Sequence, residues 1–435
     1  MSSFFKPDYN IFTETPSFQF NKIYNKISIF INIVLLVIVC KIIKRFNIDF
    51  KYIIGTYILL GVIYIILIPF EPFSDMKMVY EIAVSGFKLH QDYISFYTNN
   101  IPTVILMMLF TFLYKSIITV KIINIICNII IAYLTYKIAE NLGKKNKLYF
   151  ILCLINIPVF LYINIIYNDI AFTLLTTLLI YLTTKKNKGK WNLPLRIILS
   201  VIEFMIRPVG IIHIIAITMY EILSGKNYKL IAIFVTTVTI GIAICNLLIG
   251  VFFSKSEESC TVWSFIRMGF NEEKFGFQDG TASSKWQPKD VIERWQELGV
   301  GKIFEIIAKK EIWMFSEGTY MAERYAFGGG GSEFTTENAL TKDIQKNQDS
   351  VIRKGAEYLM KGQYFVIIVC ALFGIIKKNK SSKYKLLNYI IVGILCFYCF
   401  WEIKSRYIYS LYPIFTIYAV DGIEILSKRI NRKNV

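Results

Sequence analysis

The sequence has very little histidine: His90 and His213 are the only two among 435 residues. This scarcity argues against zinc sites and against catalysis that passes protons through several imidazoles. Cysteine is not rare, but seven of the eight cysteines lie in or beside apolar runs, and Cys260 alone lies in the large polar segment. A single cysteine has no partner there, so we expect no disulfide within that segment.

Nucleotide-binding and repeat signatures are missing as well. The glycine run in residues 327–332 neither follows a clear strand nor precedes a Lys-Ser or Lys-Thr pair, so it does not fit a nucleotide-binding loop. We predict that it is a flexible break. The chain shows no internal repeat of the kind that transporters have. ATP-driven transport by this chain alone is therefore disfavoured. The first 25 residues are polar and lack the apolar core of a secretory signal, so we expect no cleavable signal peptide.

Apolar residues are what the chain has in abundance. Hydrophobic residues make up 55% of the sequence and aromatic residues 16%, which is too apolar for an ordinary soluble domain of this size. Repeated apolar stretches of about 18–20 residues are long enough to cross the hydrocarbon core of a bilayer. We predict an all-α polytopic membrane protein with about 11–13 membrane segments.

The formal net charge of +18 raises the question of nucleic-acid binding, and the location of the charge answers it. Residues 254–361 hold 15 basic and 17 acidic side chains, so the rest of the chain carries 34 of the 49 basic and 14 of the 31 acidic residues. That excess lies in short loops between apolar runs, where the positive-inside rule places it. Nucleic acid is not an expected partner.

The basic loops also predict the topology. Loops at residues 41–51, 144–147, 185–190 and 377–385, and the basic tail, are expected to be cytoplasmic. Residues 254–361 then lie outside, and the stretch 193–223 makes two passes that turn at Arg207-Pro208. Two apolar runs, 101–113 and 118–134, break the alternation. Either one of them is half-inserted or the loop 144–147 violates the rule.

These considerations divide the chain into five parts. They are a polar N-terminal segment, a transmembrane module with its first outer loop at 70–100, an extracytoplasmic and largely helical domain, C-terminal transmembrane helices, and a basic cytoplasmic tail, at residues 1–25, 26–253, 254–361, 362–427 and 428–435.

Charged residues from four separate places come out at the same, outer face in this topology. They are Asp75, Asp169, Glu203 with Arg207, and Glu402 with Arg406. Charged residues at helix ends often only snorkel to the interface, but four such groups opposite a strongly basic face favour a site at the outer leaflet. On a helix, Glu402 and Arg406 would share a face and form a pair, and the fork of arginine suits phosphate. Asn99, Asn100 and Asn168 supply amides suited to sugar hydroxyls or to helix caps.

Several short motifs along nearly the whole chain resemble the C-type (GT-C fold) glycosyltransferases, particularly the bacterial branch related to protein O-mannosyltransferases and aminoarabinose transferases. The matching elements are Pro-Phe-Ser-Asp75-Met-x-x-Val-Tyr80, Tyr97-Thr-Asn-Asn100, Tyr167-Asn-Asp169-Ile, Ile206-Arg-Pro208-Val-Gly, residues 263–269, and Glu402-x-x-x-Arg406-Tyr407 ahead of Pro413. Two positions depart from the pattern. Thr98 stands where proline is expected, and Met76 replaces the second acid found in some relatives.

The resemblance implies a GT-C-like helical bundle with an extracytoplasmic cap, and an enzyme that transfers a sugar from a polyprenyl-phosphate donor. Asp75 is implied as the general base that deprotonates an acceptor hydroxyl, with inversion at the sugar. Arg207, Arg406 and Lys310 would offset phosphate charge, and Asp169 would bind hydroxyls of the sugar or the acceptor. The other implied substrate-binding residues are Tyr80, Asn100, Glu402 and Tyr407. No cofactor is expected, and a divalent metal at Asp75 and Asp169 is not favoured.

The expected partners are the lipid-linked sugar, an acceptor glycan, polymer or protein of the cell envelope, and the bilayer itself. The expected location is the plasma membrane, with the active site on the extracytoplasmic face. Two alternatives stay open. A lipid-linked oligosaccharide polymerase or ligase would use a diphosphate-linked donor, and a flippase would show repeats and polar residues near the bilayer midplane.

Overall fold

The computed structural model describes most of the chain. The described residues are 5–10, 15–20, 23–46, 48–225, 227–253, 259–277, 286–328, 338–347, 350–378 and 381–433. Apart from one short antiparallel hairpin near the N-terminus, the elements in these ranges are helices.

The elements are described in two parts, in chain order. The first part contains β1 (Phe5–Asn10), β2 (Thr15–Phe20), α1 (Ile23–Phe46), α2 (Phe50–Leu67), α3 (Ser74–Ser85), α4 (Gln91–Phe96), η1 (Thr98–Asn100), α5 (Ile101–Phe110), α6 (Ile117–Asn141), α7 (Leu148–Leu154), α8 (Ile157–Leu161), η2 (Tyr162–Asn164), α9 (Asp169–Thr184), α10 (Asn192–Ile206), α11 (Gly210–Leu223) and α12 (Tyr228–Phe252). The second part contains α13 (Val262–Met268), α14 (Pro288–Ser316), α15 (Ala322–Tyr325), α16 (Ala339–Lys346), α17 (Val351–Lys378), η3 (Ser382–Tyr384), α18 (Lys385–Phe400), η4 (Ser405–Leu411) and α19 (Tyr412–Lys433).

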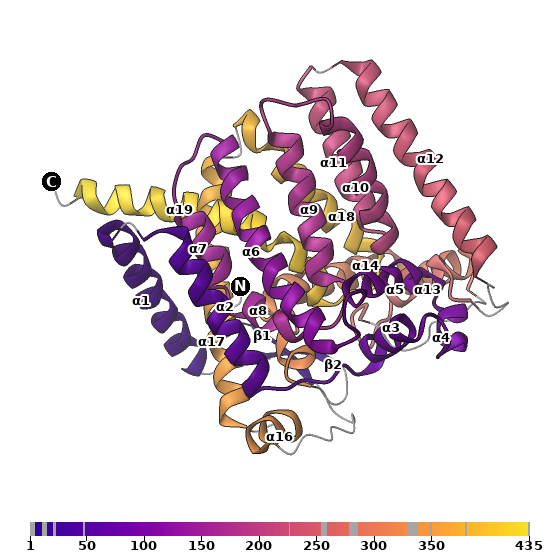
Figure 1. The fold of residues 1–435 in the computed structure, drawn as a ribbon, viewed down its shortest axis with the longest axis horizontal. Coiled ribbons are helices and arrows are strands. Elements are labelled where there is room, and N and C mark those ends of the chain that lie inside the picture. Colours follow the sequence, from indigo (N-terminus) through magenta and orange to yellow (C-terminus); the bar gives the residue numbers. More distant parts are fainter. Residues whose placement is uncertain are drawn as a thin grey trace.

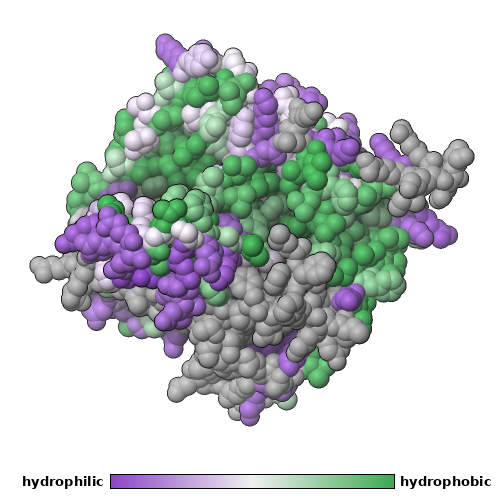
Figure 2. All heavy atoms as spheres, turned by 180° about the vertical axis from the view of Figure 1, so that it is seen from behind, coloured by the Kyte–Doolittle hydropathy of each residue, from purple (hydrophilic) through white to green (hydrophobic). Residues whose placement is uncertain are grey.

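Six helices are long and apolar enough to cross a membrane among the described residues: α1, α2, α6, α12, α17 and α18 with its preceding turn. The sequence predicts more segments than these six long helices. The difference arises because several apolar runs form shorter helices, such as α9 with 16 residues and α11 with 14. In Figure 1, α1 and α12 stand at opposite edges of the bundle. Figure 2 shows hydrophobic side chains across the middle of one face, with hydrophilic side chains gathered beyond them. The chain therefore has the build of a membrane protein.

Helix α5 explains why the predicted alternation of crossings fails. Its ten residues rise only about 15 Å, half of a hydrocarbon core. It packs against α3, and just beyond its end the Lys115 ammonium donates to the Val84 carbonyl oxygen of α3 at 2.8 Å. A helix of this length is too short to span the core, whereas α6, with 25 residues, is long enough. This favours the explanation in which one of the two apolar runs is only half-inserted.

Helices α10 and α11 are two separate helices with a break at the predicted turn. The chain leaves the helical conformation at Arg207, whose φ is −148° and ψ 128°, and α11 begins at Gly210. Because Arg207 precedes a proline, it is pushed toward this extended conformation. The break therefore lies where the sequence places it.

The chain between α6 and α9 is broken into short pieces that lie buried inside the bundle. Irregular backbone at membrane depth needs partners for its carbonyl groups. Two asparagines of α6 supply them: Asn124 donates to the Ile163 and Ile165 carbonyls at 3.1 and 2.9 Å, and Asn128 donates to that of Val159 at 3.2 Å. This support fixes the segment that leads to Asn168 and Asp169.

Two predicted boundaries fall within continuous helices. The predicted limit at residue 361 falls inside α17, which runs without interruption from Val351 to Lys378, so the polar segment and the membrane segment share one helix. The predicted basic tail begins inside α19, which extends to Lys433. In both places the helix continues because no proline stands where the polarity changes.

Residues 259–277, which include α13, dock on the end of α18 through backbone contacts. Together with α14 they are called the cap segment. Phe277 pairs with Ile403 in an isolated parallel bridge, and the Glu402 amide donates to the Phe265 carbonyl at 3.1 Å. Gly269 sits so close to this strand that a Cβ atom would meet the Trp401 carbonyl carbon and oxygen, each at 2.7 Å. The contact therefore requires glycine, because backbone atoms cannot rotate out of the way.

We predict that Gly269→Ala destabilises the protein by about 1–3 kcal/mol, the usual cost of overpacking. The measurement is thermal unfolding of the purified protein in detergent. The matched control is Gly301→Ala in α14, where a new Cβ meets nothing within 4 Å. Equal melting temperatures for the two variants would contradict the predicted contact.

Candidate functional site

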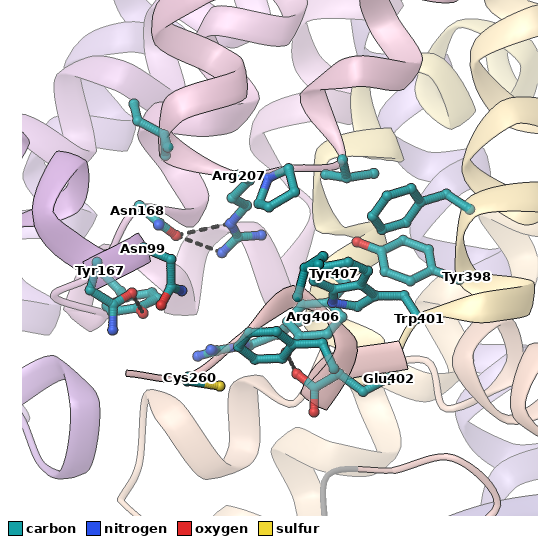
Figure 3. Close-up of a pocket in the computed structure, with 17 residues that line it drawn as sticks. Asn99, Tyr167, Asn168, Arg207, Cys260, Tyr398, Trp401, Glu402, Arg406 and Tyr407 are labelled. Atoms are coloured by element: carbon teal, nitrogen blue, oxygen red, sulfur yellow. Dashed lines mark hydrogen bonds between the residues drawn. The ribbon is translucent and has the colours of Figure 1, made fainter. Parts of the chain in front are cut away.

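A cavity of about 210 Å³ opens where the ends of α10, α18 and α13 meet. Seventeen residues line it: Asn99, Asn100, Tyr167, Asn168, Ile206, Arg207, Pro208, Val209, Cys260, Val262, Phe265, Phe397, Tyr398, Trp401, Glu402, Arg406 and Tyr407. Figure 3 shows amide side chains and Arg207 on one side, and Tyr398, Trp401 and Tyr407 on the other. Five of the predicted site residues, Asn100, Arg207, Glu402, Arg406 and Tyr407, are among these lining residues.

Arg207 is held by the start of α9. Its Nε and one Nη donate to the Asn168 side-chain oxygen at 3.0 and 2.7 Å, and the same Nη pairs with the Asp169 carboxylate. Asp169 itself is buried and lies behind Arg207 rather than in the cavity wall. It therefore orients the guanidinium, which presents its remaining donors toward the cavity.

Arg406 is buried in a different way. Only 6% of its surface is exposed, yet its guanidinium makes no hydrogen bond or ion pair with any residue that the structure describes. Its partners are aromatic rings, with centroids of Tyr325, Tyr167 and Tyr407 at 4.6, 5.1 and 5.8 Å. Cation–π contacts of this kind stabilise a cation by about 0.5–2 kcal/mol each. They do not satisfy the N–H donors of the guanidinium, of which Nε is buried and has no hydrogen-bond partner among the described residues.

Glu402 and Arg406 do not form the predicted helical pair. Ile403 is in the bridge with Phe277, and a 3₁₀ helix starts only at Ser405, so the two side chains are not one α-helical turn apart. Instead, the Tyr407 hydroxyl donates to Glu402 Oε1 at 2.5 Å. Glu402 Oε2 is buried and has no hydrogen-bond partner among the described residues. Burial raises the pKa of this carboxyl.

One wall of the cavity is a stack of aromatic rings from both sides of the cap contact. The Trp401 ring stacks on Phe265 of α13 at 5.3 Å and on Phe397 of α18 at 5.1 Å. Tyr398 and Tyr407 form a second stack at 5.7 Å. Such a wall offers a flat apolar surface opposite a polar one, an arrangement suited to an amphipathic ring such as a sugar.

Asp75 lies outside the cavity but is connected to it by hydrogen bonds. It stands in the first turn of α3, where the helix dipole favours a carboxylate. The Tyr93 hydroxyl donates to Asp75 at 3.0 Å, Asn100 donates to that hydroxyl at 2.7 Å, and the Tyr167 hydroxyl donates to Asn100 at 3.2 Å. Burial raises the pKa of Tyr93, so it acts as a donor. Asp75 thus stands at one end of a chain that leads to two cavity residues.

Three residues singled out from the sequence lie away from the cavity. Glu203 is fully buried among α9, α10 and α11, where it accepts from the Thr176 hydroxyl at 2.5 Å and faces His213 Nδ1 at 2.9 Å. Lys310 is also fully buried, and its ammonium donates to the Gly269 and Trp401 carbonyls at 3.0 and 3.1 Å. Tyr80 packs against the hydrophobic core. The structure therefore gives Lys310 a role in docking the cap.

Much of the aromatic wall is not evident from the sequence. Tyr398 and Trp401 end an apolar run and look like ordinary membrane-interface aromatics, and Phe265 and Cys260 lie far from them in sequence. Only the cap contact brings them together. In the residues that the structure describes, no group of three or more His, Cys, Asp and Glu side chains is arranged to hold a metal ion.

Comparison of the chain with protein families, with curated proteins and with solved structures finds no match. The geometry of this site therefore supplies the evidence for function.

Lys310 gives the fold a testable pH dependence, because burial lowers its pKa to about 7. Between this value and the usual pKa of about 10.4, the unfolded chain holds a proton that the folded protein does not. Stability is therefore expected to rise with pH in this window, by at most about 1.4 kcal/mol per pH unit. We predict that Lys310→Met removes this increment.

The measurement is thermal or denaturant unfolding at several pH values, compared between wild type and variant so that other titrating groups cancel. Lys309→Met is the control, since Lys309 is only partly buried and is paired with Glu305. An unchanged pH slope in Lys310→Met would refute the assignment.

Proposed function

We propose that this protein is a membrane glycosyltransferase that moves a sugar from a polyprenyl-phosphate donor to an acceptor at the outer face of the plasma membrane. The support comes from the guanidinium groups of the cavity, from its size and from the apolar groove along the same helices. The expected acceptor is a glycan, polymer or protein of the cell envelope.

The observation that carries the proposal is Arg406, a buried guanidinium whose Nε has no hydrogen-bond acceptor among the described residues. An unpaired buried charge costs several kcal/mol, so such a residue is retained where a ligand completes it. Arg207 lines the same cavity from a distant part of the chain. Two guanidinium groups that converge on one small cavity suit a phosphate group, whose oxygens accept their planar donors.

A lipid chain also has a place along the same helices. An apolar groove of about 570 Å³ lies between α11 and α18, lined mainly by Ile212, Ile215, Ala216, Met219, Tyr389 and Val392. The cavity itself is lined by Val209, just before α11, and by Phe397 and Tyr398 of α18. One pair of helices therefore carries a polar cavity at one end and an apolar groove further along. An amphiphile with a phosphate head and a hydrocarbon chain matches this pair.

The size of the cavity favours a single sugar. Ligand pockets commonly measure about 300–1,000 Å³, and this one is smaller, at about 210 Å³. A sugar ring set against the Trp401 wall, with its hydroxyls on Asn99, Asn100 and Asn168, would fill it. This supports a monosaccharide phosphate as donor over the lipid-linked oligosaccharide that a polymerase or ligase would use.

In the proposed reaction, Asp75 accepts the proton of an acceptor hydroxyl that enters from the side of α3. The acceptor oxygen forms a bond to the anomeric carbon, the bond from that carbon to the phosphate oxygen breaks, and the electron pair leaves with the lipid phosphate. Tyr93 and Asn100 hold Asp75 in register with the cavity. Arg207 and Arg406 stabilise the charge that develops on the phosphate.

We predict that Arg406→Gln lowers kcat/KM for a polyprenyl-phosphate sugar by about 10- to 100-fold, the equivalent of a lost charge-assisted hydrogen bond. The fold should survive, because the change removes a buried charge that pairs with no described residue. The assay is transfer of a radiolabelled sugar by purified protein in detergent. Arg294→Gln, at the surface of α14, is the control. Wild-type donor use by Arg406→Gln would exclude this residue from phosphate binding.

We predict that Asp75→Asn lowers kcat by about 10²- to 10⁴-fold, the usual contribution of a general base, with little change in donor binding. The amide keeps the hydrogen bond from Tyr93 but does not accept the acceptor's proton. Asp92→Asn in the neighbouring helix α4 is the matched control, since Asp92 is exposed. Transfer at near wild-type rate by Asp75→Asn would remove Asp75 from the base role.

A further inference from the structure

Glu402 and Arg406 face the same cavity without contacting each other. The carboxyl is only 3% exposed, and one of its oxygens accepts from Tyr407 while the other, Oε2, has no described partner. Arg406 Nε is likewise buried without a hydrogen-bond partner among the described residues. An acid and a base that line one cavity, each with a polar atom that no described residue satisfies, offer a ligand both a donor and an acceptor.

The charges around Glu402 come from several elements. Lys404, Arg406 and Tyr407 belong to its own segment, and Tyr398 lies on α18. Asp75 of α3, Tyr97 at the end of α4 and Cys260 before α13 face it from the other side. Burial raises the pKa of Glu402 most strongly, while Lys404, the Tyr407 hydrogen bond and Arg406 lower it. The net effect raises the pKa of the carboxyl, and a new negative charge in the cavity raises it further.

An anion bound to Arg406 acts on Glu402 in two ways. It adds negative charge beside the carboxyl, and it neutralises one of the cations that favour ionisation. Both effects favour the protonated form, which has an O–H donor that the carboxylate lacks. Since Oε1 is occupied by Tyr407, this donor falls on the oxygen that is free.

We propose that a phosphate ester binds at Arg406 together with one proton, which the Glu402 carboxyl takes up and presents to a phosphate oxygen as a hydrogen bond. The inference rests on the proposed function in that it assigns the phosphate of the donor to this cavity. In the transfer reaction the same hydrogen bond stabilises the phosphate oxygen that receives the electron pair of the broken bond. The proton on Glu402 stays on the carboxyl during transfer, and the proton of the acceptor hydroxyl goes to Asp75.

The test is the pH dependence of binding by the full chain in detergent, measured by calorimetry with methyl octyl phosphate. This phosphodiester keeps one charge throughout, unlike a monoester, whose second pKa is about 6. We expect the affinity to fall by up to about 10-fold per pH unit above the pKa of the carboxyl. The heat of binding should depend on the ionisation enthalpy of the buffer in the sense of proton uptake.

Glu402→Gln keeps a neutral donor in place of the acid, so it should bind the probe with an affinity that is independent of pH and of buffer. Glu272→Gln, which removes a surface carboxylate paired with Lys302, is the control and should keep the wild-type pH dependence. Melting temperatures check that each variant is folded.

The outcomes separate this inference from the proposed function. Binding that is independent of pH in the wild type, or a pH dependence that persists in Glu402→Gln, overturns proton coupling and leaves the donor site standing. A probe that fails to bind at any pH, while the protein is folded, overturns both. Coupling observed without any sugar transfer supports the anion site and removes the transferase.

Discussion

The pairing of Arg207 with Asp169 and Asn168 is the interaction on which the site depends. It ties the start of α9 to the break between α10 and α11, so three helices meet at one polar point. Just beneath, Glu203 joins the same helices through Thr176 and His213. Buried charges of this kind add little net stability, but they disfavour every arrangement that leaves one of them unpaired. They thereby specify the register of the helices and the direction of Arg207.

The rest of the cavity is built from the opposite side by the cap. Backbone contacts near Gly269 and the buried Lys310 ammonium hold α13 and α14 against the end of α18. As a result, Phe265 completes the aromatic wall that begins on Phe397 and Trp401. The membrane bundle supplies the fixed cations and amides, and the cap supplies the cover. A site that is shared in this way is complete only when both parts are folded, and this links the stability of the cap to the chemistry of the cavity.

Sequence patterns predicted the features that depend on local chemistry. The apolar runs, the break at Arg207-Pro208 and the convergence of Arg207, Glu402 and Arg406 on one cavity follow from hydropathy, proline geometry and loop charge. The misses have tertiary causes. The segment at Glu402 bridges to the cap instead of continuing as a helix, so the expected pair with Arg406 does not form. Lys310 is drawn inside by two carbonyls that are distant in sequence. Asp75 reaches the cavity only through Tyr93 and Asn100, a relay that no spacing rule reveals.

Helix α5 has one more consequence. Immediately after it, Phe112, Leu113 and Tyr114 are 82, 90 and 71% exposed, and Lys115 fastens this tip to the end of α3. Aromatic and aliphatic side chains at this level settle at the boundary between headgroups and hydrocarbon. Because α3 also carries Asp75, the position of this exposed apolar tip is tied to the position of the carboxylate.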